Sequence, residues 1–140
     1  MGWAQTNRSA LIRIPRYTAG QKNAVRAELR CPDASCNPYL AFAAMLAAGL
    51  DGIDRKLTPP KALNNVNVYH LTPEERKKMG IASLPGSLLE ALNELDQDKV
   101  LKSALGTTAY EEYRAVKLAE WDEYRQHVSD WEVERYLETV

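Results

Sequence analysis

Long apolar segments are absent from this sequence of 140 residues. The longest apolar run, "YLAFAAMLAAGL", is too short to span a bilayer, so we expect a core helix there and no membrane partner. The first residues contain neither the basic nor the apolar segment of a signal peptide. With 45% apolar and 26% charged residues, the composition is that of a globular domain or a piece of one, and we expect a cytoplasmic protein.

The sequence also lacks an excess of basic residues and has few cysteines. Its formal net charge of −1 argues against a general nucleic-acid binder, which needs a basic excess or a basic face. Cys31 and Cys36 have a C-x4-C spacing that is unusual for zinc, and no second Cys or His pair supplies further ligands. We therefore predict two free thiols that are buried or half-buried.

Extended chain is predicted near the N-terminus, where charged and apolar residues alternate. The segment "SALIRIP" is rich in branched apolar residues and closes with Pro15. The segment "AVRAELRC" alternates strictly, so Arg26, Glu28 and Arg30 would project to one face of a strand. These two segments predict two strands of a sheet whose other members are not evident.

A helix is predicted from Pro38 to about Arg55. Asn37 is a good N-cap, and Pro38 would occupy the first helical position. The body of this segment is rich in Ala and Leu and is apolar on nearly every side. This pattern predicts a helix that is buried all round.

Capping-box patterns predict the starts of three further helices. The patterns are Thr72 with Glu75, Ser87 with Glu90, and Thr108 with Glu111. Gly80 would end the first of these helices. The last long helix has one aromatic-rich stripe, which we interpret as packing surface and which comprises Tyr110, Tyr113, Lys117, Trp121, Tyr124 and Val128. The ending "SDWEVERYLETV" predicts a further short helix or an arm.

The predicted elements do not add up to a complete domain. Two strands cannot form a stable sheet alone, and an all-apolar helix needs more cover than a few amphipathic helices provide. The simplest explanation is that part of the protein is absent from this chain. We therefore predict the α+β fold class, as a mainly helical fragment with two N-terminal strands.

Five charged residues in the extended region form a candidate site: Arg8, Arg13, Arg26, Glu28 and Arg30. Guanidinium groups suit bidentate binding of carboxylates and phosphates, and same-face neighbours on a strand start roughly 6.6–6.8 Å apart. A carboxylate between two guanidinium groups stays ionised, as an oxygen ligand of Mg²⁺ or Mn²⁺ must. The alternative is a solvated strand face with cross-strand ion pairs, which contribute little stability.

Arg8 and Arg13 do not fit one regular strand. They are an odd number of residues apart, so a flat strand would send them to opposite faces. Either Arg8 lies before the strand proper, or a bulge re-aims one of the two side chains.

Two strings in this region resemble one enzyme family. "NRSALIRIP" and "RAELRCPDASCNPYLAFAAMLAAGLDGI" closely resemble the C-terminal part of the catalytic domain of glutamine synthetase, and their pairing is highly specific. The resemblance continues through "NVYHLTPEERKKMG" and "AEWDEYRQHVSDWEVERYL" and covers the chain from Trp3 onward. Type I enzymes of bacteria and archaea look closest. Tyr69 matches a segment that some relatives adenylylate, but the chain end resembles the variety without that control.

The resemblance implies a role for each charged residue of the candidate site. It implies that Arg8 contacts the γ-phosphate region and the glutamate substrate and stabilises the transition state. Arg13 and Arg26 match arginines that bind ATP. Glu28 matches the glutamate that ligates the metal ion, Mg²⁺ or Mn²⁺, and Arg30 matches the arginine that holds the side-chain carboxylate of the substrate.

The same resemblance implies a reaction and an assembly. The family uses ATP to phosphorylate the γ-carboxylate of L-glutamate, and ammonia then displaces phosphate to give glutamine. The full-length family is expected to form a homo-oligomer, a dodecamer of two hexameric rings. Its other metal-binding residues, its ammonium-site aspartate and its flap glutamate lie upstream of the matched segment, so we expect the fragment alone to be inactive.

We expect three parts in the fragment, namely strands with the site residues (3–30), a helical part (37–128) and a C-terminal arm (129–140). Two alternatives stay open. The protein could belong to relatives that join glutamate to polyamines or other amines. It could also be a non-catalytic helical oligomerisation module, whose apolar contacts would come from Trp131, Val133, Tyr136 and Leu137.

Overall fold

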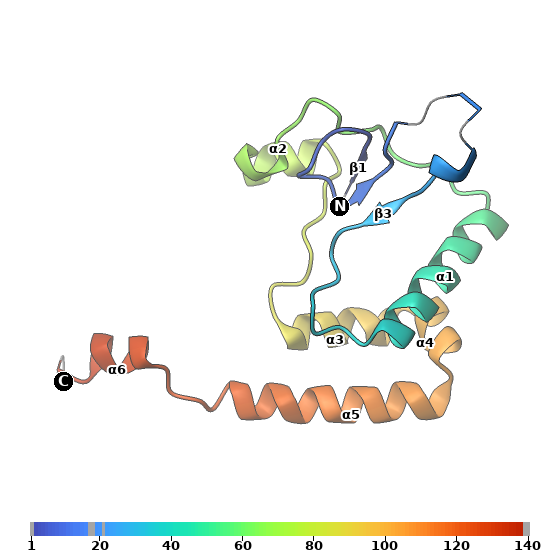
Figure 1. Cartoon of the computed structure of the whole chain (residues 1–140). Helices are drawn as coiled ribbons and strands as arrows, with labels where there is room; N and C mark the ends of the chain where they lie inside the picture. Colours follow the sequence, from blue (N-terminus) through green and yellow to red (C-terminus); the bar gives the residue numbers. More distant parts are fainter. Residues whose placement is uncertain (1, 17–18, 21, 139–140) are drawn as a thin grey trace. The chain divides into compact units, whose positions relative to one another are not determined.

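The computed structural model describes residues 2–16, 19–20 and 22–138 (Figure 1). The chain divides into two compact units, Met1–Leu84 and Pro85–Val140. Unit 1 contains the strands and two α-helices, whereas the described part of unit 2 is helical. This composition confirms the predicted α+β class. No described helix combines the length and the apolar character that crossing a membrane requires.

The sheet of unit 1 has three very short strands in the order β1 (Trp3–Ala4), β2 (Ile12–Arg13) and β3 (Glu28–Leu29). β1 runs parallel to β2, and β2 runs antiparallel to β3. The two predicted strands are present, and β1 is an additional member that the sequence did not indicate. Two residues are too few to show an alternating pattern, so β1 is defined by its pairing and not by its own sequence.

Helix α1 (Pro38–Asp54) begins as predicted but is not buried. The Asn37 side chain accepts hydrogen bonds from the amides of Tyr39 (3.0 Å) and Leu40 (3.3 Å), which confirms the N-cap. No residue of α1 is buried, and Phe42 is 69% exposed. The prediction of burial all round is wrong for this chain, because the described strands and helices give α1 no extensive cover.

The loop between β3 and α1 corrects a second prediction. Cys31 and Cys36 are free, as predicted, but both are exposed rather than buried. The reason is local, since every residue from 30 to 39 is exposed. The small apolar core of unit 1 lies elsewhere, around the buried residues Ala4, Ala10 and Leu63.

The segment after α1 returns to the sheet and ends in a capped helix. The Leu63 amide donates to the Trp3 carbonyl (2.9 Å), which fixes this segment beside β1. The 3-10 helices are η1 (Lys22–Ala24) and η2 (Val68–His70), and α2 (Pro73–Lys78) follows η2. The predicted capping box of Thr72 and Glu75 is complete, and Gly80 follows α2 in the left-handed region with φ 66°.

Unit 2 contains α3 (Leu88–Gln97), α4 (Lys99–Leu105), α5 (Thr107–Tyr124) and α6 (Asp130–Tyr136). At α3 only half of the predicted box forms. Ser87 Oγ accepts from the Glu90 amide (3.2 Å), but the Glu90 carboxylate accepts from Gly86 (2.7 Å) instead of Ser87. Helix α4 was not predicted. The Asp98 side chain caps it by accepting hydrogen bonds from the amides of Val100 (2.9 Å) and Leu101 (3.0 Å).

The predicted start of α5 is wrong. The helix begins at Thr107 with Gly106 (φ 73°) as N-cap and without a side-chain cap, so Thr108 and Glu111 form no capping box there. Because the helix already begins at Thr107, Thr108 has helical geometry and cannot act as its N-cap. The predicted packing stripe is half-buried at Tyr110, Tyr113, Lys117 and Trp121. Tyr124 is 70% exposed, and Val128 lies beyond the end of the helix, so the prediction of packing surface is wrong for these two residues.

A polar cluster centred on Asp96 joins α3, α4 and α5. The Asp96 carboxylate accepts from the Tyr110 hydroxyl (2.6 Å) and from Arg114 Nε (2.9 and 3.0 Å). Lys102 Nζ donates to the Asp96 carbonyl (3.2 Å) and lies 4.8 Å from the centre of the Tyr110 ring. Charge-assisted bonds of this kind hold a helix pair in one register.

The Asp96 cluster predicts a stability of unit 2 that declines at both ends of the pH scale. The bonds from Tyr110 and Arg114 lower the pKa of Asp96 below its ordinary 3.8, so their stabilisation is present above that pH and is lost as the pH falls. The bond to Asp96 raises the pKa of Tyr110 above its ordinary 10.0, so that stabilisation is lost as the pH rises beyond this value.

We expect the free energy of unfolding, measured with urea, to fall below about pH 4 and above about pH 10. Both slopes should be shallower in Asp96→Ala. Asp122→Ala is the matched control, because Asp122 forms an exposed i,i+3 ion pair with Arg125 and lies outside the cluster. If the free energy of unfolding depended on pH equally in the two variants, the pH dependence would not come from the Asp96 cluster.

Candidate functional site

Arg8 is positioned by the two residues that flank it. Asn7 Nδ2 donates to the Leu63 carbonyl (2.6 Å), and Ser9 Oγ accepts from the Val68 amide (3.2 Å). Asn7 Oδ1 in turn accepts from the amide (2.9 Å) and the hydroxyl (2.8 Å) of Ser9. These bonds tie the turn that carries Arg8 to the segment that leads into η2, while Arg8 itself stays exposed.

Arg8 lies in a turn that precedes β2. Of the two explanations for its odd spacing from Arg13, the structure therefore confirms the first. The direction of its side chain is set by the turn and not by the pleat of the strand.

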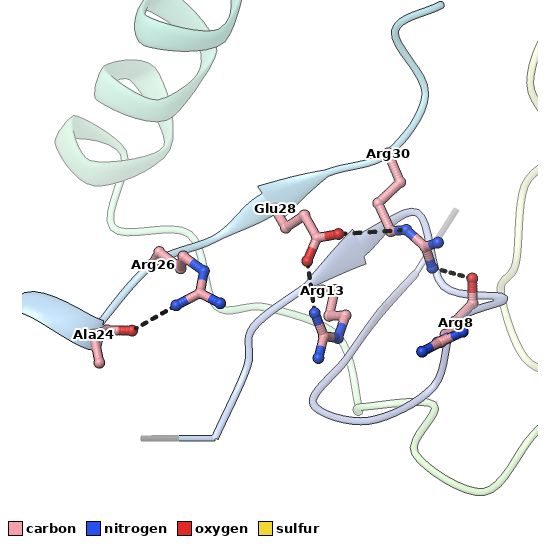
Figure 2. Close-up of polar contacts among 6 residues, drawn as sticks. All are labelled: Arg8, Arg13, Ala24, Arg26, Glu28 and Arg30. Atoms are coloured by element: carbon pink, nitrogen blue, oxygen red, sulfur yellow. Dashed lines mark hydrogen bonds and ion pairs between the residues drawn. The ribbon is translucent and has the colours of Figure 1, made fainter. Parts of the chain in front are cut away.

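Arg13 on β2, Glu28 on β3 and Arg30, which directly follows β3, form a line of charge (Figure 2). Arg13 and Glu28 are directly paired residues of the two strands, and Arg13 Nη1 lies 2.8 Å from Glu28 Oε2. Arg30 Nε lies 3.8 Å from Glu28 Oε1 on the other side of the carboxylate. The Glu28 carboxylate thus sits between two guanidinium groups. Arg30 is one of the two that the alternation in the sequence suggested, but the second is Arg13 of the paired strand and not Arg26.

This arrangement keeps Glu28 ionised. The hydrogen bond from Arg13 is the largest influence that lowers the pKa of Glu28 below its ordinary value. The positive charges of Arg13, Arg30 and Arg26 act in the same direction, and partial burial opposes them.

The remaining arginines lie around this centre. Arg30 Nη1 also donates to the Arg8 carbonyl, which connects β3 to the turn (Figure 2). Arg26 makes one long hydrogen bond to the Ala24 carbonyl (3.5 Å) and lies at the edge of the cluster. All five predicted site residues therefore belong to one region of unit 1.

Stability alone does not account for this concentration of charge. The side chains of Arg13 and Glu28 are 33% and 43% exposed, and exposed ion pairs contribute little to stability. A cross-strand ion pair is also what a solvated strand face would contain. The geometry thus agrees with both interpretations of the charged strands.

A divalent cation fits Glu28 only in part. An ionised carboxylate is a suitable ligand for Mg²⁺ or Mn²⁺. Among the described residues, however, no group of three or more His, Cys, Asp or Glu side chains is arranged to hold a metal ion. Glu28 can therefore supply one ligand of such an ion, and the others have to come from elsewhere.

Asn7 and Ser9 are positioning residues that the sequence analysis did not single out. Their types gave a signal, since Asn and Ser side chains often bond to nearby backbone in turns. Their partners, Leu63 and Val68, lie 56 and 59 positions along the chain from Asn7 and Ser9 respectively. No local pattern shows such a contact.

Comparison with known proteins identifies what this arrangement resembles. The family model described as "Glutamine synthetase, catalytic domain" matches residues 1–136. Curated glutamine synthetases of Methanocaldococcus jannaschii and Thermus thermophilus are each 51% identical to this chain, over 98% and 99% of its length respectively. The matched regions are 29% and 30% of those proteins, so the chain spans about three tenths of the length of these relatives.

A solved structure shows the same fold. The structure of GmaS without ligand has a TM-score of 0.72 and 34% sequence identity. The match covers 97% of this chain and 29% of that one.

Proposed function

Since this chain belongs to the glutamine synthetase catalytic-domain family, we propose that it forms one wall of the ATP, metal and glutamate sites of a glutamine-forming ligase. The observation that carries the proposal is the Glu28 carboxylate held between Arg13 and Arg30 on paired strands. The family match adds a reason for charges that stability does not explain.

The reaction that we propose joins ammonia to L-glutamate through a γ-glutamyl phosphate formed from ATP. A phosphate group and a carboxylate repel one another, so the site must neutralise both before they can meet. Arg13 and Arg26 would bind the phosphates of ATP, and Arg30 would hold the side-chain carboxylate of glutamate. Arg8 would stabilise the negative charge that spreads in the transition state.

The ionised Glu28 would serve as a ligand of Mg²⁺ or Mn²⁺. When bound, such an ion supplies positive charge that neutralises the phosphate oxygens. The residues of this chain fix the carboxylate by the register of Arg13 and Glu28 and keep it deprotonated.

The isolated chain is expected to lack activity, because Glu28 alone cannot meet the coordination of a catalytic metal pair. We expect no γ-glutamyl transfer above background with Mn²⁺. A chimera in which this chain replaces the matched region of the Thermus thermophilus relative should form glutamine. Turnover by the isolated chain would refute its inactivity, and an inactive but folded chimera would refute the proposed function.

The amine acceptor is a separate question. The proposed sites of this chain bind ATP, metal and glutamate, so they leave the choice of amine to residues elsewhere. A γ-glutamyl-amine ligase remains the alternative within the family. Rates of the natural full-length protein with ammonium and with putrescine would decide between the two.

A non-catalytic oligomerisation module is favoured by one observation. Helix α6 and the residue after it expose the four apolar residues that the sequence indicated: Trp131, Val133, Tyr136 and Leu137. Exposed apolar area of this kind marks a surface made for a partner. Light scattering over a concentration series should show self-association of the chain, whereas a monomer at high concentration would count against the module.

A further inference from the structure

An arginine-lined cavity lies within unit 1, beside the line of charge described above. It has a volume of about 470 Å³, and Arg8, Arg30 and Arg76 contribute to its lining. Cavities of this size accommodate small ligands. No Asp or Glu is found among the described residues that line it, so positive charge accumulates around the space.

Two of these guanidinium groups have unused binding capacity. Neither Arg8 nor Arg76 forms an ion pair with a carboxylate in the part of the chain that the structure describes. Arg76 Nε is buried and lacks a hydrogen-bond acceptor among the described residues. Because Nε has no exposed surface, an anion in the cavity would be bound by the terminal N–H groups of Arg76, which suit bidentate binding of oxyanions.

The backbone of Arg76 is fixed on both sides. Its amide donates to the Thr72 carbonyl (3.0 Å), and its carbonyl accepts from the Ile81 amide (2.9 Å). The neighbouring Glu75 does not neutralise it, because its carboxylate accepts from the amide (2.8 Å) and hydroxyl (2.9 Å) of Thr72. The capping box of α2 thus holds the carboxylate of Glu75 at Thr72, and the structure shows no ion pair between Glu75 and Arg76.

We propose that Arg76 is a third anion-binding residue of this cavity and that the cavity takes a small oxyanion of the carboxylate or phosphate class. Guanidinium groups bind both through paired N–H donors. The inference rests on the proposed function, in which Arg8 and Arg30 face the phosphate and the glutamate carboxylate. Arg76 adds a contact from α2, which the family resemblance of the charged strands does not assign.

The test measures binding of L-glutamate and of inorganic phosphate to the 140-residue chain by calorimetry at low ionic strength, where screening is weak. Arg76→Gln is expected to weaken binding of one or both by about tenfold. Lys77→Gln is the matched control, because it removes the same charge from α2 and Lys77 does not line the cavity. Arg76→Lys should recover part of the affinity, and urea unfolding checks that all variants fold.

The outcomes separate this inference from the proposed function. The anion whose affinity falls in Arg76→Gln, glutamate or phosphate, is the one that Arg76 contacts. If Arg76→Gln and Lys77→Gln bind alike while Arg8→Gln binds weakly, Arg76 has no such role and the proposed function stands. If only Arg76→Gln is affected, the cavity binds an anion but the proposed role of Arg8 fails. A folded chain that binds neither anion overturns the inference, whereas glutamine formation by the chimera would still support the proposed function.

Discussion

Replacing Arg8 with Gln in the chimera is expected to lower the turnover number by about 100-fold or more, with a smaller change in the Michaelis constants. The reason is that a fixed positive charge aimed at the developing phosphoryl charge acts mainly in the transition state. Asn7 and Ser9 hold the backbone of the turn that carries Arg8, which limits the reorganisation needed to place its charge. Steady-state kinetics of glutamine formation measure the effect.

Arg55→Gln is the control for this experiment. Arg55 forms an exposed i,i+4 pair with Asp51 at the end of α1, outside the candidate site, so its turnover should stay within about twofold of the parent. The assignment fails if Arg8→Gln raises only the Michaelis constant for glutamate. That result would make Arg8 a ground-state binding residue without a part in the chemical step.

A variant of Asn7 tests whether the turn matters in its own right. Asn7→Ala removes the side chain that bonds to the Leu63 carbonyl and to Ser9, but it leaves every site arginine in place. A lower turnover in folded Asn7→Ala would show that positioning of Arg8, and not charge alone, is what the N-R-S turn provides.

The parts of the fold that could be predicted are those fixed by neighbouring residues. Asn37 and Pro38 start α1, and Thr72 with Glu75 starts α2, because each cap needs only amides two or three residues away. The same rule explains the failure at Thr108. A capping residue must itself lie outside the helix, and Thr108 is already the second residue of the helix that Gly106 starts.

The parts that could not be predicted depend on what lies across space. Strand β1 exists through pairing with β2 and through the Leu63 amide, neither of which its two residues encode. The apolar pattern of α1 shows what the helix requires, but its exposure depends on which segments are present to cover it. Alternation placed Glu28 and its flanking arginines on one face, and only the register with β2 identified Arg13 as the closest partner.

Glu28 and Arg13 are expected to affect metal binding in opposite directions. Glu28→Gln replaces an ionised carboxylate by a neutral amide among three arginines, so the affinity of the chimera for Mn²⁺ should fall by about tenfold or more. Arg13→Gln should raise the affinity for Mn²⁺ measured without nucleotide, because Arg13 occupies Glu28 Oε2 at 2.8 Å and competes with the ion. Electron paramagnetic resonance of free Mn²⁺ measures both.

The same substitution of Arg13 should lower the affinity for ATP, since the proposed role of its guanidinium group is to bind phosphate. Glu111→Gln, an exposed carboxylate on α5, is the control and should leave Mn²⁺ binding unchanged. If Arg13→Gln lowers the affinity for Mn²⁺, as Glu28→Gln does, the two residues act as a structural pair. Arg13 then does not compete with the ion for the Glu28 carboxylate. If Arg13→Gln raises the affinity for Mn²⁺ and lowers the affinity for ATP, Arg13 and Glu28 pair with each other only while their ligands are absent. Mn²⁺ then takes the place of Arg13 at Glu28, and the phosphates of ATP take the place of Glu28 at Arg13.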